Sequence, residues 1–199
     1  MTDVSVRRPR ATPQAAALLL VAAGGWALTV PRALDMGSTP GTMGLSLAAF
    51  LVMWSLMMAA MMLPAIASVT GLYVRTFTDR PWVRTAQLAG GYLLAWAAAG
   101  VPLFLLARVA DHAPDGSLWP RWLAAAIFAT AGGWQLSGAK DRCLRHCRSP
   151  LGLLLHYGSY RGRGRDLRVG LHHAAWCLGC CWALMVLFVA FGVMNLGAM

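Results

Sequence analysis

Histidine and cysteine recur at helical spacing in one apolar stretch of the chain. His173, Cys177 and Cys180 are spaced i, i+4 and i+7, and Cys181 follows directly. In an α-helix of about 3.6 residues per turn, the first three lie within roughly 60° of one another, with Cys181 on the adjacent edge. An imidazole and three thiols on one helix face are typical ligands of a soft or borderline metal ion, and thiols also carry out disulfide exchange.

Methionine forms a second sulfur-rich stripe, made of Met57 and Met61 beside Trp54. These three side chains also fall within roughly 60° on a helix. Pro64 follows, and because its ring removes a backbone hydrogen bond, it predicts a bend beside the stripe. Thioethers bind soft metal ions, but methionine is also an ordinary filler of apolar packing, so the stripe alone fits both interpretations.

Cys143 and Cys147 form a third group, one helical turn apart in a basic segment. Arg142, Arg145 and Arg148 surround them in the sequence. Since nearby positive charge stabilises a thiolate, we expect these arginines to lower the pKa of both thiols. The alternative interpretation is a pair of reduced, unreactive cysteines.

The composition indicates what kind of fold positions these groups. Of the 199 residues, 58% are hydrophobic and 12% are charged, and the mean hydropathy is +0.58. A soluble domain of this size cannot bury so much apolar surface, and apolar runs near the length of a bilayer crossing recur along the chain. We therefore predict an all-α, polytopic membrane helix bundle in a single domain over residues 1–199. About five transmembrane helices are expected, at residues 11–31, 45–73, 85–107, 119–137 and 169–194, and none of these segments contains an acidic residue.

Residues 138–168 form the one long connection, which we predict to be a cytoplasmic loop rich in cysteine and arginine. Ser149 and Pro150 suit the cap and the first position of a short interfacial helix over residues 151–157.

The distribution of Lys and Arg predicts the orientation of the helices. With a cytoplasmic N-terminus, fourteen of the 17 basic residues lie inside and three lie outside. This orientation places the C-terminus outside and predicts an integral protein of the bacterial inner membrane. The net charge of +10 then reflects topology and contact with the anionic lipid bilayer, so no nucleic-acid partner is expected.

Two short strings recur in the same order along the chain. Residues 23–28 and 131–136 match at five of six positions around Ala-Gly-Gly-Trp, and residues 54–57 and 182–185 share Trp, Leu and Met. Helices offset by three run in opposite directions, so this pattern is typical of an inverted repeat of three plus three helices, truncated by the loss of the sixth. It would bring Trp54 and Trp182 to similar depth. Chance matching of common residues is the alternative.

Three ordered motifs resemble a family of predicted metal-binding integral membrane proteins that is classed as a domain of unknown function. The resemblance extends from about residue 45 to the C-terminus and implies a metal without naming it. The chain has Gly138 and Ala139 where such sequences tend to have Pro and Leu. The matching residues are Trp54, Met57, Ala60, Met61, Met62 and Pro64; Gln135, Leu136, Ser137, Lys140, Cys143, Leu144, Cys147, Arg148, Ser149 and Pro150; and Gly170, Cys177, Gly179, Cys180, Cys181, Trp182, Leu184 and Met185.

Soft ligands in an interior without carboxylates favour Cu(I), and zinc is second through the Cys and His groups alone. We predict that the helices with the methionine and cysteine stripes pack together, so that Met57 or Met61 approaches Cys177 or Cys180, with His173 at the cytoplasmic mouth. The predicted ligands are Met57, Met61, His173, Cys177, Cys180 and Cys181, with Cys143 and Cys147 as a separate cytoplasmic donor or acceptor site.

Three functions remain open at this point. The first is transfer, uptake or insertion of Cu(I), with a metallochaperone or a membrane complex as partner. The second is an enzyme, a thiol-disulfide oxidoreductase that passes electrons between Cys143/Cys147 and Cys177/Cys180; against it, all five thiols lie on the reducing side of the predicted topology. The third is a non-catalytic structural subunit of a membrane complex, in which Cys and Met only pack.

Overall fold

The described part of the chain is built from helices. The computed structural model describes residues 12–36, 41–42, 44–76, 79–112, 119–148, 150–162 and 164–191, and these contain seven α-helices and no strand. The predicted all-α class is therefore confirmed. Residue 11, Ser149 and residues 192–194, which the sequence assigned to helices or to a cap, lie outside this range. The helices are α1 (Pro13–Met36), α2 (Leu47–Arg75), α3 (Pro81–Asp111), α4 (Trp119–Gln135), α5 (Gly138–Arg148), α6 (Pro150–Tyr157) and α7 (Arg165–Phe191).

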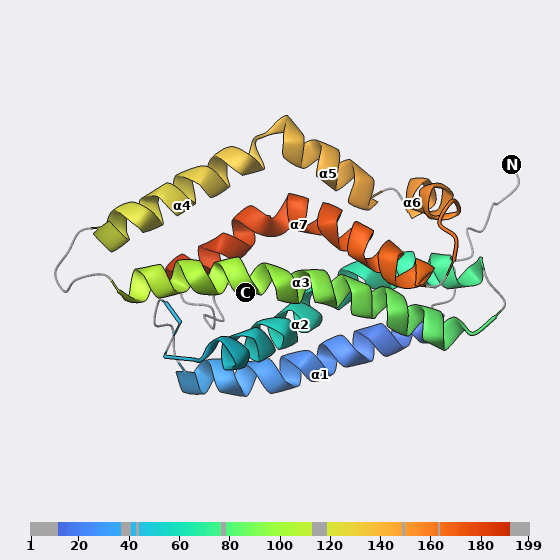
Figure 1. Ribbon diagram of the computed structural model, residues 1–199, viewed down its shortest axis with the longest axis horizontal. Helices are drawn as coiled ribbons and strands as arrows, with labels where there is room; N and C mark the ends of the chain where they lie inside the picture. Colours follow the sequence, from blue (N-terminus) through green and yellow to red (C-terminus); the bar gives the residue numbers. More distant parts are fainter. Residues whose placement is uncertain are drawn as a thin grey trace, which may run out of the picture.

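Helices α3 and α7 form the centre of the bundle (Figure 1). The pair α1 and α2 lies on one side, with α1 packed on α2 and α2 packed on α3. On the opposite side, α4 and α5 together form a bent arm that packs along α7, and α6 lies at one end of the bundle. The central pair therefore contacts both outer layers.

Paired glycines allow α3 and α7 to cross at backbone contact. A Cβ built at Gly91 would lie 3.1 Å from the carbonyl carbon of Leu167, and one built at Gly170 would lie 2.9 Å from the backbone nitrogen of Tyr92. Backbone atoms cannot rotate aside as side chains do, so any larger residue would force the helices apart. This close crossing fixes the position of α7 relative to α3.

A helix break between α4 and α5 turns the arm back along α7. The Ser137 hydroxyl accepts a hydrogen bond from the backbone nitrogen of Lys140 at 3.2 Å, which caps a new helix that starts at Gly138. The Lys140 ammonium also bonds the side-chain oxygen of Gln135 across the break. The segment predicted to leave the bundle as a loop therefore begins with a helix packed on α7.

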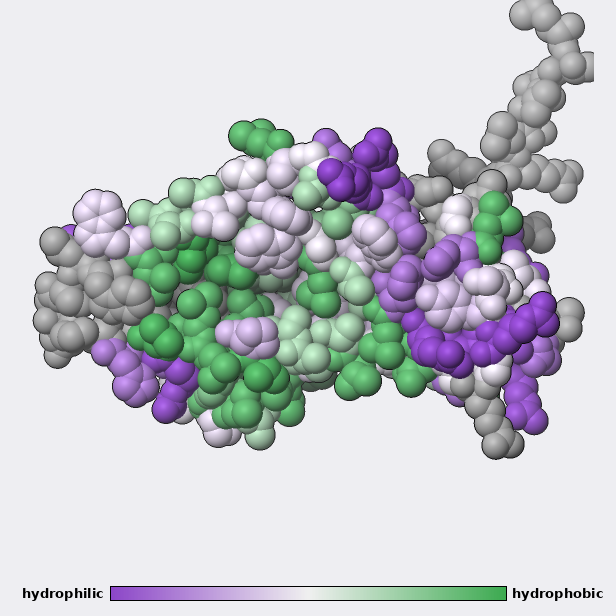
Figure 2. Space-filling model, turned by 45° about the horizontal axis from the view of Figure 1, so that its top comes forward, coloured by the Kyte–Doolittle hydropathy of each residue, from purple (hydrophilic) through white to green (hydrophobic). Residues whose placement is uncertain are grey.

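Four of the described helices are long and apolar enough to cross a membrane: α1, α2, α3 and α7. Helix α4 begins at the predicted residue 119 and has 17 residues, which is the lower limit for a helix that crosses a bilayer. Figure 2 shows extensive hydrophobic surface along the body of the molecule, whereas hydrophilic residues gather at the end where α6 lies. This distribution suits helices that are apolar along their length and polar at their ends.

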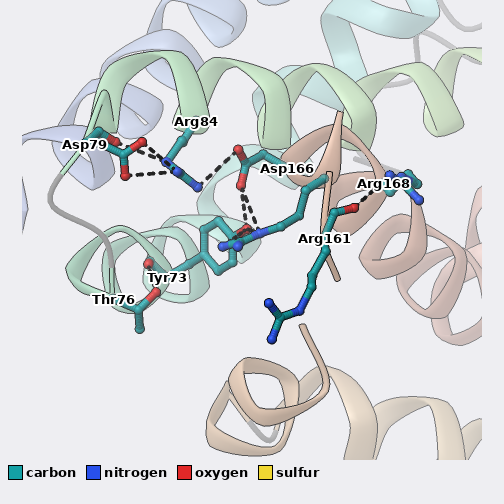
Figure 3. A network of polar contacts seen from close by, with 8 residues as sticks. Tyr73, Thr76, Asp79, Arg84, Arg161, Asp166 and Arg168 are labelled. Atoms are coloured by element: carbon teal, nitrogen blue, oxygen red, sulfur yellow. Dashed lines mark hydrogen bonds and ion pairs between the residues drawn. The ribbon is translucent and has the colours of Figure 1, made fainter. Parts of the chain in front are cut away.

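A polar network joins α2, α3 and α7 at the same end of the bundle (Figure 3). The buried carboxylate of Asp166 accepts a hydrogen bond from the Tyr73 hydroxyl at 2.5 Å and lies 3.5 Å from Nη1 of Arg84. Arg84 also forms an ion pair with Asp79 at 2.8 Å. Helices α3 and α7 each begin four residues before the predicted start, so α3 includes Arg84 and α7 includes Asp166. The network compensates them by pairing.

The two copies of the Ala-Gly-Gly-Trp string have different surroundings. A Cβ at Gly25 would lie 3.1 Å from the Cβ of Ala60, so Gly25 serves the contact of α1 with α2, whereas Gly24 has no atom within 4 Å. Gly132 and Gly133 have no atom within 4 Å of the corresponding position. The inverted repeat stays a prediction, and its glycines do not share one packing role.

Candidate metal centre

Helix α7 presents three free thiols within reach of a single ion. The sulfurs of Cys177, Cys180 and Cys181 lie within 4.8 Å of one another, and those of Cys180 and Cys181 are 3.3 Å apart. Two thiolates bound to one ion at about 2.3 Å are at most about 4.6 Å apart. Only small side-chain adjustments are therefore needed for these sulfurs to share an ion. The helical spacing predicted from the sequence accounts for this group, in which Cys177 and Cys180 are buried and Cys181 is half-buried.

Helix α5 brings the remaining two thiols to the same place. The Cys147 side chain packs against the part of the core that contains Cys177 and Cys180. The Cys143 sulfur lies against Gly179, where an added Cβ would be 2.9 Å from it. The break at Ser137 folds α5 onto α7, so Cys143 and Cys147, predicted as a separate site, lie beside the thiols of α7. All five cysteines form one cluster, which we call the thiol cluster.

The environment of Cys147 differs from the one predicted from its arginine neighbours. The Cys147 side chain is half-buried against the core beside the thiols of α7. The side chains of Arg142 and Arg145 are exposed, on the side of α5 away from this contact. The lowering of the thiol pKa by these arginines stays a prediction. A metal ion at this thiol must displace a proton.

Tyr92 on α3 completes the surroundings of the thiols. Its hydroxyl donates a hydrogen bond to the Cys177 sulfur at 3.1 Å. The His173 ring is buried beside Tyr92, with ring centroids 6.0 Å apart, and its Nδ1 has no hydrogen-bond partner among the described residues. The contact of Tyr92 with Cys177 was not predicted, because only the crossing of α3 and α7 at their glycines brings these residues together.

The methionine stripe lies elsewhere in the bundle. Met57 is fully buried and Met61 is half-buried in the hydrophobic core. Among the described residues, α2 packs mainly on α1 and α3, and it shares no extended interface with α7. The predicted packing of the two stripes is therefore wrong, since α3 contacts both helices and occupies the position between them. Pro64 lies inside α2, which continues through it to Arg75.

The two tryptophans of the sequence repeat line one cavity. Trp54 on α2 and Trp182 on α7 both border a cavity of about 280 Å³, together with residues of α3. The Trp54 indole donates a hydrogen bond to the backbone oxygen of Trp96 at 2.8 Å, and Trp182 packs edge-on against Trp134, with ring centroids 5.3 Å apart. Both tryptophan side chains therefore pack between helices.

Comparison with known proteins gives one assignment. A family model described as PpoB2, copper chaperone, matches residues 51–199. Searches of curated proteins and of solved structures gave no match. The matched region contains all five cysteines of the thiol cluster.

Proposed function

The chain belongs to the PpoB2 copper chaperone family, and we propose that it binds and hands on copper as Cu(I) through the thiol cluster. The observation that carries this proposal is the group of three thiols on α7, Cys177, Cys180 and Cys181, with the cysteines of α5 packed beside it. Thiolates are soft ligands that select Cu(I) among the first-row metal ions, and two or three of them suffice to hold it. The cluster contains more thiols than one ion needs. An incoming ligand from an acceptor protein can therefore replace the bound thiols one at a time.

Zinc is the second candidate ion for the same residues. Four thiolates, or three with the His173 imidazole, would meet its tetrahedral preference. The family assignment favours copper, so we propose zinc only as a competitor that the cluster must discriminate against.

The setting we propose for this site is a membrane. The four apolar helices support insertion, and the excess of basic residues in the predicted inner segments supports a cytoplasmic N-terminus. Helices α4 and α5 together run the length of the bundle, so we infer that they form the fifth crossing as a discontinuous helix (Figure 1). Discontinuous crossings are typical of proteins that bind ions within the membrane.

The exposed face of α5 indicates where a partner would bind. Asp141, Arg142 and Arg145 are exposed on a helix that packs along α7. Charges at membrane depth require contact with water or protein, because transfer to hydrocarbon is costly. We therefore propose that a metallochaperone or a membrane-complex partner covers this face, next to the thiols that would exchange the ion.

The Cu(I) affinity of cysteine variants tests the proposal. In detergent-solubilised protein titrated with Cu(I) against a colorimetric Cu(I) chelator, the double change Cys177→Ser and Cys180→Ser should abolish high-affinity binding. Cys143→Ser and Cys147→Ser are matched changes in the same helix, and their affinities show how much each thiol of α5 contributes beside the thiols of α7. Unchanged affinity in the double variant would overturn the proposal.

Thiol-disulfide exchange is the second candidate function, supported by the contact of Cys147 with Cys177. An oxidoreductase would carry a disulfide between α5 and α7 in part of its cycle. Counting free thiols and bound metal in protein purified without reductant separates the two functions. A copper carrier keeps five thiols and binds Cu(I), whereas an oxidoreductase loses thiols in pairs and binds none.

A further inference from the structure

The Tyr92 hydroxyl is a buried donor that reaches the thiols of α7 from α3. It donates a hydrogen bond to the Cys177 sulfur at 3.1 Å, and both side chains are buried. The apolar stretches that carry the two residues, 85–107 on α3 and 169–191 on α7, contain no acidic residue, lysine or arginine. A neutral hydroxyl, and not a cation from either stretch, therefore faces this sulfur.

Backbone contact between the two helices fixes where this hydroxyl lies. The backbone nitrogen of Tyr92 is 2.9 Å from the position that a Cβ at Gly170 would take, so the two backbones are in contact here. The Tyr92 ring packs edge-on against Trp96, with ring centroids 6.5 Å apart, and its centroid lies 6.0 Å from that of His173. The hydroxyl is therefore held beside Cys177 before any ion arrives.

Binding of copper changes the charge of the sulfur that accepts this hydrogen bond. A Cu(I) ion held by two thiolates carries one net negative charge, which is costly in an apolar interior unless hydrogen bonds compensate it. A hydrogen bond to an ionised acceptor is roughly twice as strong as one to a neutral acceptor. The bond from Tyr92 therefore stabilises the copper-bound form of Cys177 more than the metal-free thiol.

We propose that Tyr92 is a positioning residue of the copper site, which holds the Cys177 sulfur and stabilises the Cu(I) thiolate through its hydroxyl. This inference rests on the proposed function, because it concerns the ion bound at the thiol cluster. Tyr92 does not ligate the ion, and it raises the affinity of the cluster for Cu(I) through the sulfur of Cys177. Outer-shell partners of this kind contribute roughly 10- to 100-fold to metal affinity.

Packing of the aromatic ring is the competing explanation for Tyr92. Tyr92→Phe separates the two, since phenylalanine keeps the ring beside Trp96 and His173 and removes only the hydroxyl. Tyr73→Phe is the matched control, because Tyr73 is also buried and its hydroxyl bonds the Asp166 carboxylate rather than a thiol. A loss of affinity in Tyr92→Phe alone therefore reports on the hydroxyl at the thiols.

A double-mutant cycle with Cys177→Ala tests whether Tyr92 acts through that sulfur. Full-length protein in detergent is titrated with Cu(I) against a colorimetric chelator, and far-ultraviolet circular dichroism checks the fold of each variant. Tyr92→Phe should weaken Cu(I) binding roughly 10- to 100-fold in the protein that keeps Cys177. In the Cys177→Ala protein, where Cys180 and Cys181 still bind the ion, it should change the affinity by less than about 2-fold. Tyr73→Phe should leave the affinity unchanged.

The thiolate-to-copper absorption of the loaded protein gives a second measurement. A hydrogen-bond donor lowers the energy of the sulfur lone pairs, so the charge-transfer band should move to longer wavelength in Tyr92→Phe. A purely structural role of Tyr92 would leave the band in place.

Two results would overturn the role of Tyr92 while leaving the copper site in place. One is equal Cu(I) affinity of Tyr92→Phe and the unaltered protein. The other is the same loss of affinity with and without Cys177 and an unmoved absorption band, since Tyr92 would then act on the fold. Absence of Cu(I) binding in the unaltered protein would instead overturn the proposed function, and this inference with it.

Discussion

Replacing Gly91 by alanine should push α3 away from α7 and disturb the thiol cluster from a distance. The added methyl group would lie 3.1 Å from the carbonyl carbon of Leu167 and 3.2 Å from the backbone nitrogen of Leu171, and closer still to the Leu167 oxygen. To restore ordinary contacts of about 3.5 Å, the helices must separate by roughly 1 Å. Tyr92 follows Gly91, so a shift of this size breaks its hydrogen bond to Cys177.

The adjacent glycine provides a matched control. A Cβ at Gly90 has no atom within 4 Å, so Gly90→Ala should only add helix propensity and stabilise the protein by up to about 1 kcal/mol. Gly91→Ala carries an overpacking cost of about 1–3 kcal/mol. The gain in helix propensity is the same for both variants, so their free energies of unfolding should differ by the overpacking cost, roughly 1–3 kcal/mol.

Reversible unfolding in mixed micelles, with increasing denaturing detergent and helix content followed by circular dichroism, measures this difference. Cu(I) affinity is measured on the same samples. Equal stability of Gly90→Ala and Gly91→Ala would refute the backbone contact between α3 and α7. If Gly91→Ala is destabilised but binds Cu(I) with unchanged affinity, the close contact of α3 with α7 is supported. The dependence of the thiol cluster on that contact is then refuted.

Three further predictions concern the polar network, the methionine stripe and the orientation. Asp166→Asn should lower the free energy of unfolding by about 1.5–3 kcal/mol, because a buried charge-assisted hydrogen bond is lost. Asp79→Asn, at an exposed ion pair, should have no measurable effect on stability. Equal effects of the two changes would contradict a stabilising role for the buried Asp166 carboxylate. Met57→Leu should leave Cu(I) affinity unchanged, because the helix that carries Met57 packs on α1 and α3 rather than on α7. A clear loss of affinity would restore Met57 as a ligand. A reporter enzyme that works only outside the cytoplasm should be active when fused after Met199. Activity of a reporter that works only in the cytoplasm would reverse the proposed orientation.

Local sequence spacing was sufficient to predict the thiols of α7. Cys177 and Cys180 lie on one helix face because they are spaced by about one helical turn. Their thiols identify the kind of ligand without further structural information. The apolar runs likewise predicted the all-helical class. The first turns of α3 and α7 were not predicted, because hydropathy locates only the apolar part of a helix. The ion pair between Arg84 of α3 and Asp166 of α7 lets both helices include charged residues at these ends.

Contacts between distant segments could not be predicted in the same way. The fold-back of α5 depends on the cap at Ser137 and on the space that Gly179 leaves for Cys143, and neither signals a partner helix in the sequence. The predicted pairing of Met57 with the thiols failed because equal depth in a bundle does not imply adjacency. Helix α3 packs on both α2 and α7. Its contact with α7 depends on glycines that lie against backbone atoms of residues distant in the sequence.

The coordination shell of the bound copper tests the central claim most directly. Extended X-ray absorption at the copper edge, on full-length protein loaded with one equivalent of Cu(I), should show two or three sulfur neighbours at about 2.3 Å. The sulfur shell should disappear in the variant with Cys177→Ser and Cys180→Ser. A shell of nitrogen or oxygen alone in the unaltered protein, or the same sulfur shell in the double variant, would contradict a copper site at the thiol cluster.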